Sequence, residues 1–126
     1  MNTHNKFTVL YADDDEDSCT MLSTLLDYSE IDVSCAHTVK EAFLSAQTKK
    51  FDLFLLASRF DDGSGEELCR ALREFFSQTP IMFFSGDASE TDRRNGIAAG
   101  AMAYFAKPDS ETVAETITRL SAQRVR

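Results

Sequence analysis

Residues 51 to 57 read Phe51-Asp52-Leu53-Phe54-Leu55-Leu56-Ala57, with apolar side chains at the last five positions. Consecutive side chains of a β-strand point to opposite faces, so an unbroken apolar run predicts a strand covered on both faces. Strands of this kind belong to parallel sheets, which need crossover connections between successive strands. The run therefore predicts the centre of an α/β sheet that has helices on both sides.

Other apolar runs lie before and after this segment and alternate with helical patterns. They predict further strands at 7–12, 31–36, 81–84 and 102–106. The alternation predicts a doubly wound, five-stranded parallel sheet with right-handed crossovers, a flavodoxin-like (βα)5 fold. A chain of 126 residues suits one domain, so we expect a single domain over 1–126.

The spacing of apolar residues also predicts the buried face of each helix. We expect the following side chains to point inward: Met21, Leu22, Leu25 and Leu26 in the first helix, and Leu68, Ala71, Leu72, Phe75 and Phe76 in the third. Capping boxes at Thr38–Glu41 and Ser64–Glu67 mark two helix starts. Residues 58–63 predict a loop, and the polar segment 88–96 predicts a short, marginally stable helix.

Composition narrows the classes of function. The net charge of −8 would repel phosphate backbones, which argues against nucleic-acid binding. The sequence has no apolar run of the roughly 20 residues that a bilayer span needs, and residues 1–6 have no signal-peptide pattern. We therefore expect a cytoplasmic protein without a membrane partner. The three cysteines, Cys19, Cys35 and Cys69, have no metal-ligand spacing and are predicted to be reduced packing residues.

Chemically active side chains follow the predicted strands at their carboxyl ends. Asp13 and Asp14 follow the first strand, Ser85 the fourth and Lys107 the fifth. Ligands of open α/β sheets bind at this edge, so these residues should share one site. Paired carboxylates suit Mg²⁺, and a lysine with a hydroxyl suits phosphoryl oxygens.

Together these segments resemble the receiver domain of two-component response regulators, from Phe7 to about Leu120. The matching motifs are Tyr11-Ala12-Asp13-Asp14-Asp15, Phe51-Asp52-Leu53-Phe54-Leu55-Leu56, Asp62-Gly63-Ser64-Gly65, Phe84-Ser85-Gly86, Gly100-Ala101 and Tyr104-Phe105-Ala106-Lys107-Pro108. Each motif alone is weak, but all of them in this order and spacing are a strong signal.

The resemblance implies a role for each matching position. Asp13 and Asp14 would bind Mg²⁺, Ser85 and Lys107 would contact a phosphoryl group, and Tyr104 would swing inward as a switch. The resemblance assigns the phospho-acceptor to position 57, which a histidine kinase would modify. This position is Ala57, and Asp61 replaces a proline of the family pattern.

The alanine changes what the site is expected to do. Ala57 has neither a nucleophile nor a metal-ligating oxygen, so the acceptor position is non-functional. We expect Lys107 to pair with Asp13 or Asp14, and Mg²⁺ to bind weakly or not at all. Ser58 is expected to point to the opposite face from Ala57, and the loop acids Asp61 and Asp62 to be solvated.

These observations predict a non-enzymatic signalling module, a receiver that acts through protein–protein contacts without aspartyl phosphorylation. The resemblance implies a histidine kinase or a downstream output protein as partner, bound on the surface of the fourth helix, fifth strand and fifth helix. A homodimer is a further option.

Two alternatives remain open. The chain could be a substituted, non-phosphorylatable form of an ordinary phospho-accepting regulator. Alternatively, Asp13-Asp14-Asp15 could serve a haloacid-dehalogenase-like phosphatase, with Asp13 as nucleophile and Asp15 as general acid.

Overall fold

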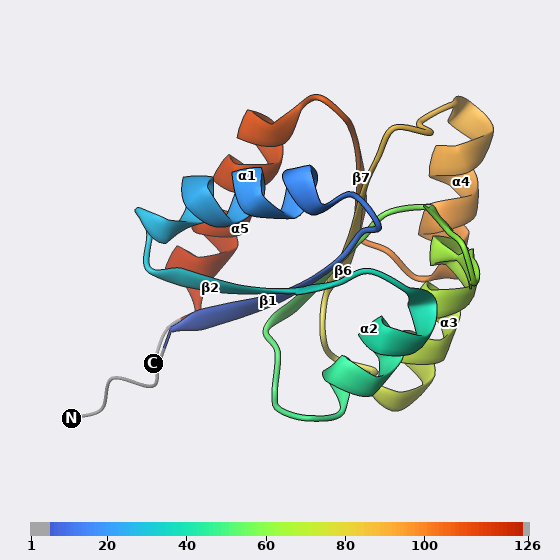
Figure 1. Ribbon diagram of the computed structural model, residues 1–126, viewed down its shortest axis with the longest axis horizontal. Coiled ribbons are helices and arrows are strands. Elements are labelled where there is room, and N and C mark those ends of the chain that lie inside the picture. Colours follow the sequence, from blue (N-terminus) through green and yellow to red (C-terminus); the bar gives the residue numbers. More distant parts are fainter. Residues whose placement is uncertain (1–5, 125–126) are drawn as a thin grey trace.

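A five-stranded parallel sheet forms the centre of the molecule (Figure 1). The computed structural model describes residues 6–124, so the predicted lack of a leader in residues 1–5 lies outside the described part. The strand order is β2-β1-β3-β6-β7. The strands are β1 (Phe7–Ala12), β2 (Ile31–Ala36), β3 (Leu53–Leu56), β6 (Ile81–Ser85) and β7 (Ala103–Ala106). The predicted doubly wound fold class is confirmed.

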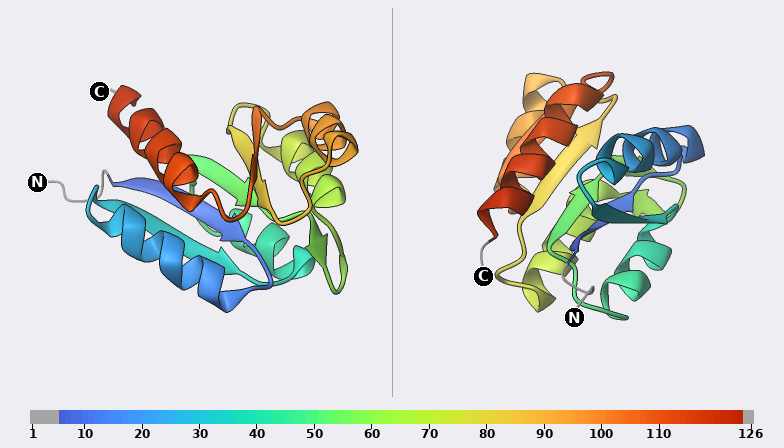
Figure 2. Two further views of the ribbon diagram at one scale, coloured as in Figure 1. Left: turned by 90° about the horizontal axis from the view of Figure 1, so that it is seen from above. Right: turned by 90° about the vertical axis from the view of Figure 1, so that its left-hand side faces the viewer.

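Helices cover both faces of the sheet (Figures 1 and 2). On one face lie α1 (Glu16–Asp27) and α5 (Ser110–Gln123); on the other lie α2 (Val39–Ala46), α3 (Gly65–Phe75) and α4 (Glu90–Ala99). The core is accordingly divided into two apolar clusters, one on each face. Among the described residues, no helix is long and apolar enough to cross a membrane.

The central strand β3 is buried along its whole length, as its apolar run predicts. Leu53 and Leu55 pack toward α1 and α5, whereas Phe54 and Leu56 pack toward α2, α3 and α4. Ala57 belongs to the same cluster as Leu56. The alternation of faces therefore ends at Leu56, one residue before the predicted end of the strand.

The inward faces of two helices are narrower than the sequence predicts. In α1 the buried apolar residues are Cys19, Leu22 and Leu26, whereas Met21 and Leu25 are 43% and 37% exposed. In α3, Phe75 is 67% exposed. A helix that lies on a flat sheet buries only a stripe of residues three and four apart, and these side chains lie beside that stripe.

A small hairpin replaces the loop predicted at 58–63. It consists of β4 (Arg59–Phe60) and β5 (Gly63–Ser64). The Asp62 carboxylate in its turn accepts hydrogen bonds from the backbone N–H groups of Val39 and Lys40, at 2.8 and 3.0 Å. Asp62 is therefore not merely solvated, because it caps the first turn of α2.

The capping boxes agree with the sequence in one case and partly in the other. Ser64 and Glu67 form the predicted reciprocal box at the start of α3. Thr38 caps α2 through Glu41 N–H, but the Glu41 carboxylate accepts from His37 N–H instead of Thr38 N–H. The predicted helix of segment 88–96 is α4, which begins with a third box, Ser89 with Asp92, and buries only Gly96 and Ala99.

The cysteines differ from the prediction of three reduced thiols. The structure pairs Cys19 of α1 with Cys35 of β2 in a disulfide whose Cα atoms are 6.3 Å apart. Cys69 stays free and buried, and burial raises the pKa of its thiol to about 11. Sequence spacing could not reveal the pair, because only the packing of α1 against β2 brings the two side chains together.

Candidate functional site

The carboxyl ends of four adjacent strands form the candidate site. Asp13 follows β1, Ala57 follows β3, Ser85 ends β6 and Lys107 follows β7. Because β3 lies between β1 and β6, Ala57 stands between two hydrogen-bonded clusters. We call them the acid cluster (Tyr11, Asp13, Asp15, Ser18, Lys107) and the hydroxyl cluster (Ser58, Arg59, Ser85, Asp87).

Asp13 is the centre of the acid cluster and is 2% exposed. Its Oδ2 accepts hydrogen bonds from Lys107 Nζ and from the Tyr11 hydroxyl, both at 2.7 Å. Its Oδ1 accepts from Asp15 N–H at 2.9 Å. The predicted pairing of Lys107 with one of the two adjacent acids is thus present, and it compensates a carboxylate that would otherwise be costly to bury.

Tyr11 is a member of the site that the sequence analysis missed. Burial, followed by the hydrogen bond to Asp13, raises the pKa of the Tyr11 hydroxyl far above its ordinary value. Tyr11 therefore stays neutral and acts as a permanent donor to Asp13. A signal was available, because Tyr11 is two residues before Asp13 at the end of the first predicted strand, where an extended chain would bring both side chains to the same face.

Ser18 links the lysine to the start of α1. Lys107 Nζ donates to Ser18 Oγ at 2.9 Å, and Ser18 Oγ donates to Asp15 Oδ2 at 2.8 Å. Asp15 is also the N-cap of α1 and accepts from Asp17 N–H. The Ser18 hydrogen bond is the main reason why the pKa of Asp15 is lowered, which makes this residue a poor proton donor.

The oxygen donors around Asp13 do not fit a tight Mg²⁺ site. Both Asp13 oxygens already accept hydrogen bonds, Asp14 is exposed, and Ala57 supplies no oxygen. Within residues 6–124 no three His, Cys, Asp or Glu side chains are arranged to hold a metal ion. Mg²⁺ is usually held by one or two carboxylates that face the ion, whereas here the oxygens of Asp13 face Lys107, the Tyr11 hydroxyl and Asp15 N–H.

The hydroxyl cluster corrects the expectation for Ser58. Its hydroxyl shares a hydrogen bond with that of Ser85, at an Oγ–Oγ distance of 2.6 Å. Ser58 reaches Ser85 because β3 has already ended at Leu56, so strand alternation no longer applies to it. Asp87 N–H donates to Ser85 Oγ at 3.0 Å, and Arg59 Nε pairs with the Asp87 carboxylate at 2.7 Å.

Tyr104 lies inward, with 8% of its surface exposed. Its ring stacks on Phe83 with centroids 5.1 Å apart, and its hydroxyl donates to the Asp87 carbonyl. Gly96 makes room for the ring, since a Cβ there would be 2.8 Å from Tyr104 Cδ2. Burial raises the pKa of the Tyr104 hydroxyl, which therefore remains a neutral donor.

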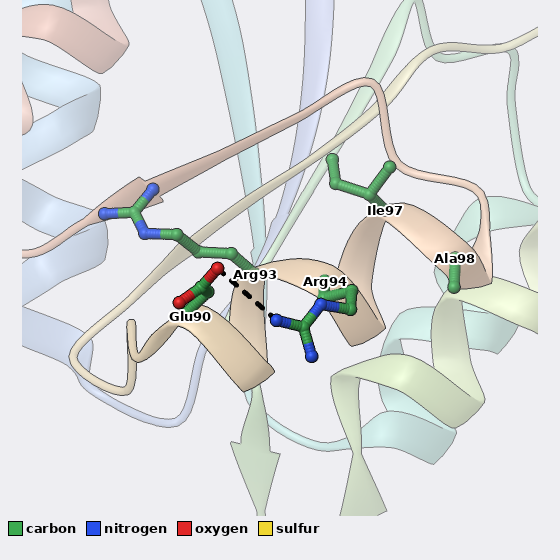
Figure 3. A pocket seen from close by; sticks show the side chains of 5 residues that line it. All are labelled: Glu90, Arg93, Arg94, Ile97 and Ala98. Atoms are coloured by element: carbon green, nitrogen blue, oxygen red, sulfur yellow. Dashed lines mark ion pairs between the residues drawn. The ribbon is translucent and has the colours of Figure 1, made fainter.

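The outer side of α4 forms a hollow of about 500 Å³ near this tyrosine (Figure 3). Its walls are Glu90, Arg93, Arg94, Ile97 and Ala98. Arg94 pairs with Glu90 at 3.4 Å, whereas Arg93 extends the other way and donates to the Tyr104 carbonyl at 2.9 Å. The backbone of β7 is thereby tied to the exposed side of α4.

Taken together, the fold and the strand-end residues define a class: α/β proteins with a charged site at the carboxyl edge of a doubly wound sheet. The family described as response regulator receiver domain matches residues 9–118. The chain therefore belongs to the response regulator receiver domain family.

Relatives and solved structures agree with this assignment. The chain is 34% identical over 102 residues to the alkaline phosphatase synthesis transcriptional regulatory protein PhoP of Bacillus subtilis, covering 81% of the chain and 42% of PhoP. It is 34% identical over 100 residues to the KDP operon transcriptional regulatory protein KdpE of Escherichia coli, covering 79% and 44%. The chain thus spans less than half the length of these relatives.

Two solved structures illustrate the similarity of the fold. A two-component response regulator from Clostridium difficile superposes with a TM-score of 0.87 at 24% identity, covering 94% of this chain and 98% of that one. The chemotaxis response regulator CheY4 of Vibrio cholerae superposes with a TM-score of 0.82 at 28% identity, covering 91% and 98%.

Proposed function

We propose that this chain is a two-component signalling receiver that works through protein–protein contacts and accepts no phosphoryl group itself. The observation that carries the proposal is Ala57, which stands at the end of β3 between the acid cluster and the hydroxyl cluster. A methyl group has no nucleophilic oxygen, so no acyl phosphate can form at this position.

Contacts inside the two clusters support the proposal. Ser85 and Lys107, which the family resemblance assigns to phosphoryl contacts, are bonded to Ser58 and Asp13. In the folded chain these two side chains are therefore engaged with groups of the protein. The hydrogen bonds to both oxygens of Asp13, together with the exposure of Asp14, likewise support weak or vacant Mg²⁺ binding at these two residues.

Tyr104 supports a form of signalling that is independent of phosphate. In the family it resembles, the aromatic residue at this position swings inward as the switch. Here Tyr104 is held inward by Phe83 and by the Asp87 carbonyl, and neither contact involves a phosphoryl group. In our proposal these contacts keep the surface of α4, β7 and α5 in its partner-binding form.

That surface carries features suited to a protein partner. Ile97 is 48% exposed and Met102 is 55% exposed, and Arg93 and Arg94 add positive charge to an otherwise acidic chain. The proposed partner is a histidine kinase or a downstream output protein, and a second copy of the chain could use the same surface. The transcriptional roles in the names of PhoP and KdpE are those of the relatives.

The proposal makes the chain a non-enzymatic module of the cytoplasm, acting without a membrane or nucleic-acid partner. The phosphatase alternative finds no support, since Asp13 is buried with both oxygens bonded and the pKa of Asp15 is lowered. A general acid needs a pKa near the working pH, whereas the pKa of Asp15 is lowered and so lies further from it.

Acetyl phosphate treatment tests the proposal directly. The unchanged chain and an Ala57→Asp variant are incubated with acetyl phosphate and Mg²⁺, and their intact masses are measured. We expect no added phosphoryl group on the unchanged chain and one on the variant, because the introduced carboxylate would supply the missing nucleophile. A receiver that has its own acceptor aspartate is the positive control. A phosphoryl adduct on the unchanged chain would overturn the proposal.

A further inference from the structure

The disulfide between Cys19 and Cys35 plays no part in the function proposed above. It joins the first part of α1 to the end of β2, across a sequence separation of 16. The Cα–Cα distance of 6.3 Å lies inside the range of about 4.4–6.8 Å that disulfides span without backbone movement. The backbone around the pair is therefore placed so that the bond can form without a rearrangement of the fold.

We propose that Cys19 and Cys35 are a reversible redox site, oxidised by small-molecule disulfides of the glutathione type and reduced by the matching thiols. The proposal rests on unequal exposure. Cys19 is 7% exposed and packs in the cluster beneath α1, whereas Cys35 is half-buried on β2, which is an edge strand of the sheet. Cys35 is the more accessible residue of the pair, so exchange with a small thiol or disulfide begins at Cys35.

The exchange is balanced in two steps. In the reduced chain the Cys35 thiolate attacks the small disulfide RSSR, which forms a Cys35–SR mixed disulfide and releases RS⁻. Cys19 then attacks the Cys35 sulfur and releases a second RS⁻. Two electrons pass from the protein dithiol to RSSR, and the two thiol protons end on two molecules of RSH.

The position of the pair links it to the acid cluster. Cys19 is next to Ser18, which accepts from Lys107 and donates to Asp15. Cys35 is next to Ala36, whose carbonyl accepts from Asp13 N–H at 2.9 Å. The disulfide thus joins α1 to β2, the two elements that adjoin residues 13–15. Its opening loosens residues 13–15, which hold the Asp13 carboxylate next to Lys107. This inference does not depend on the loss of phosphorylation at Ala57.

Redox titration tests the site. The full chain is equilibrated in glutathione buffers of increasing oxidised fraction, acid-quenched, unfolded, labelled with N-ethylmaleimide and weighed by mass spectrometry. We expect a change from three labelled thiols to one, with peptide mapping that shows a Cys19–Cys35 link and labelled Cys69. Cys69→Ser is the matched control and should titrate in the same way. Cys35→Ser, a mild change at a half-buried position, should form no internal link.

Two results would overturn the proposal. If no Cys19–Cys35 link forms at any glutathione ratio, the pair is not a redox site. If the link persists in excess reduced glutathione, it is a permanent structural bond. Oxidation should also raise the Tm of the unchanged chain and of Cys69→Ser by roughly 5–10 °C, because it closes a loop in the unfolded chain, and should leave Cys35→Ser unchanged.

Hydrogen exchange tests the link to the acid cluster. Amides of residues 13–18 should exchange roughly tenfold more slowly in the oxidised chain than in the reduced chain. Amides of α3, on the opposite face of the sheet, should slow only by the amount that the change in global stability requires. Equal exchange of residues 13–18 in both forms would refute the coupling, even if the disulfide itself is reversible.

Discussion

At the scale of single residues, the polar side chains of this receiver's site form hydrogen bonds with one another. Ser58 bonds to Ser85, and Lys107 bonds to Asp13, so the groups on both sides of Ala57 have partners in the folded chain. Tyr11 adds a buried hydroxyl that donates to Asp13, a contact that the sequence motifs alone do not predict. The alanine at position 57 therefore leaves no neighbouring polar side chain without a hydrogen bond. Among residues 6–124, every buried side-chain polar atom has a hydrogen-bond partner.

Gly96 decides whether Tyr104 can stay inward. A Cβ at this position would be 2.8 Å from Tyr104 Cδ2 and 3.1 Å from Phe83 Cδ1, both closer than ordinary packing allows. We expect Gly96→Ala to push the Tyr104 ring out. Overpacking costs about 1–3 kcal/mol, and about 1 kcal/mol is offset by the better helix propensity of alanine. The measurement is ¹⁹F NMR of fluorotyrosine-labelled protein, combined with urea unfolding.

The chain provides a matched control for this variant. A Cβ at Gly86 would meet no atom within 4 Å, so Gly86→Ala should change neither the Tyr104 resonance nor stability by more than about 0.5 kcal/mol. The Tyr104 signal is assigned with Tyr104→Phe. An unchanged Tyr104 resonance in Gly96→Ala would show that the ring does not depend on the glycine.

At the scale of elements, the β4–β5 hairpin is the feature that most departs from the sequence-based expectation. It turns back over the end of β3, where Gly65 N–H donates to the Ser58 carbonyl at 2.8 Å. A side chain at Gly65 would collide with the Ala57 carbonyl, so glycine is required for this close approach. Through Asp62 the same hairpin caps α2, which connects two elements that are not adjacent in sequence.

Asp62 predicts a pH dependence of stability. Hydrogen bonds from the Val39 and Lys40 N–H groups lower its pKa from the ordinary value of 3.8. A carboxyl with a lowered folded pKa stabilises the fold above its unfolded pKa, and this contribution is lost as the pH falls through the folded pKa. Asp62→Asn should therefore have a lower urea midpoint than the unchanged chain at pH 7, and the difference should shrink below about pH 3.8.

Asp61→Asn is the control for this comparison, since Asp61 is an exposed neighbour in the same turn. Its urea midpoint should match that of the unchanged chain. If Asp62→Asn differed from the unchanged chain by the same amount at pH 3 and at pH 7, the charge of Asp62 would not be the cause.

For the whole molecule, the sheet separates two cores that share no side chains. Ile81 lies in the cluster under α2, α3 and α4, whereas Ile117 of α5 lies in the cluster on the other face. Both are fully buried. If the domain unfolds cooperatively, a destabilising substitution in either core should shift the same single unfolding transition.

Paired substitutions test this arrangement. Ile81→Val and Ile117→Val should each lower the free energy of unfolding by about 0.5–1.5 kcal/mol, and the double variant should equal their sum within about 0.5 kcal/mol. Urea unfolding followed by circular dichroism measures all four proteins. A coupling above about 1 kcal/mol would mean that the two cores reorganise together, and two separate transitions would mean that they do not unfold as one unit.

The sequence alone determined the architecture, because periodicity is a local property. The apolar run at Leu53–Leu56 predicted a strand covered on both faces, and its alternation with helices predicted a parallel sheet, as the structure has it. It also determined which residues lie at one edge of the sheet, since Asp13, Ala57, Ser85 and Lys107 are each at or directly after the carboxyl end of a strand. The inability of Ala57 to accept a phosphoryl group follows from its side chain alone.

Only the tertiary structure decided the partners of these residues. The Ser58–Ser85 bond depends on where β3 ends, the Cys19–Cys35 pair on how α1 lies against β2, and the Asp62 cap on how the hairpin folds back. The inward position of Tyr104 depends on the space left by Gly96, eight positions earlier in the chain. Hydrogen bonds and close packing act over a few ångströms between segments distant in sequence. A sequence pattern can therefore predict that such groups lie at one edge of the sheet, but it cannot predict which of them are in contact.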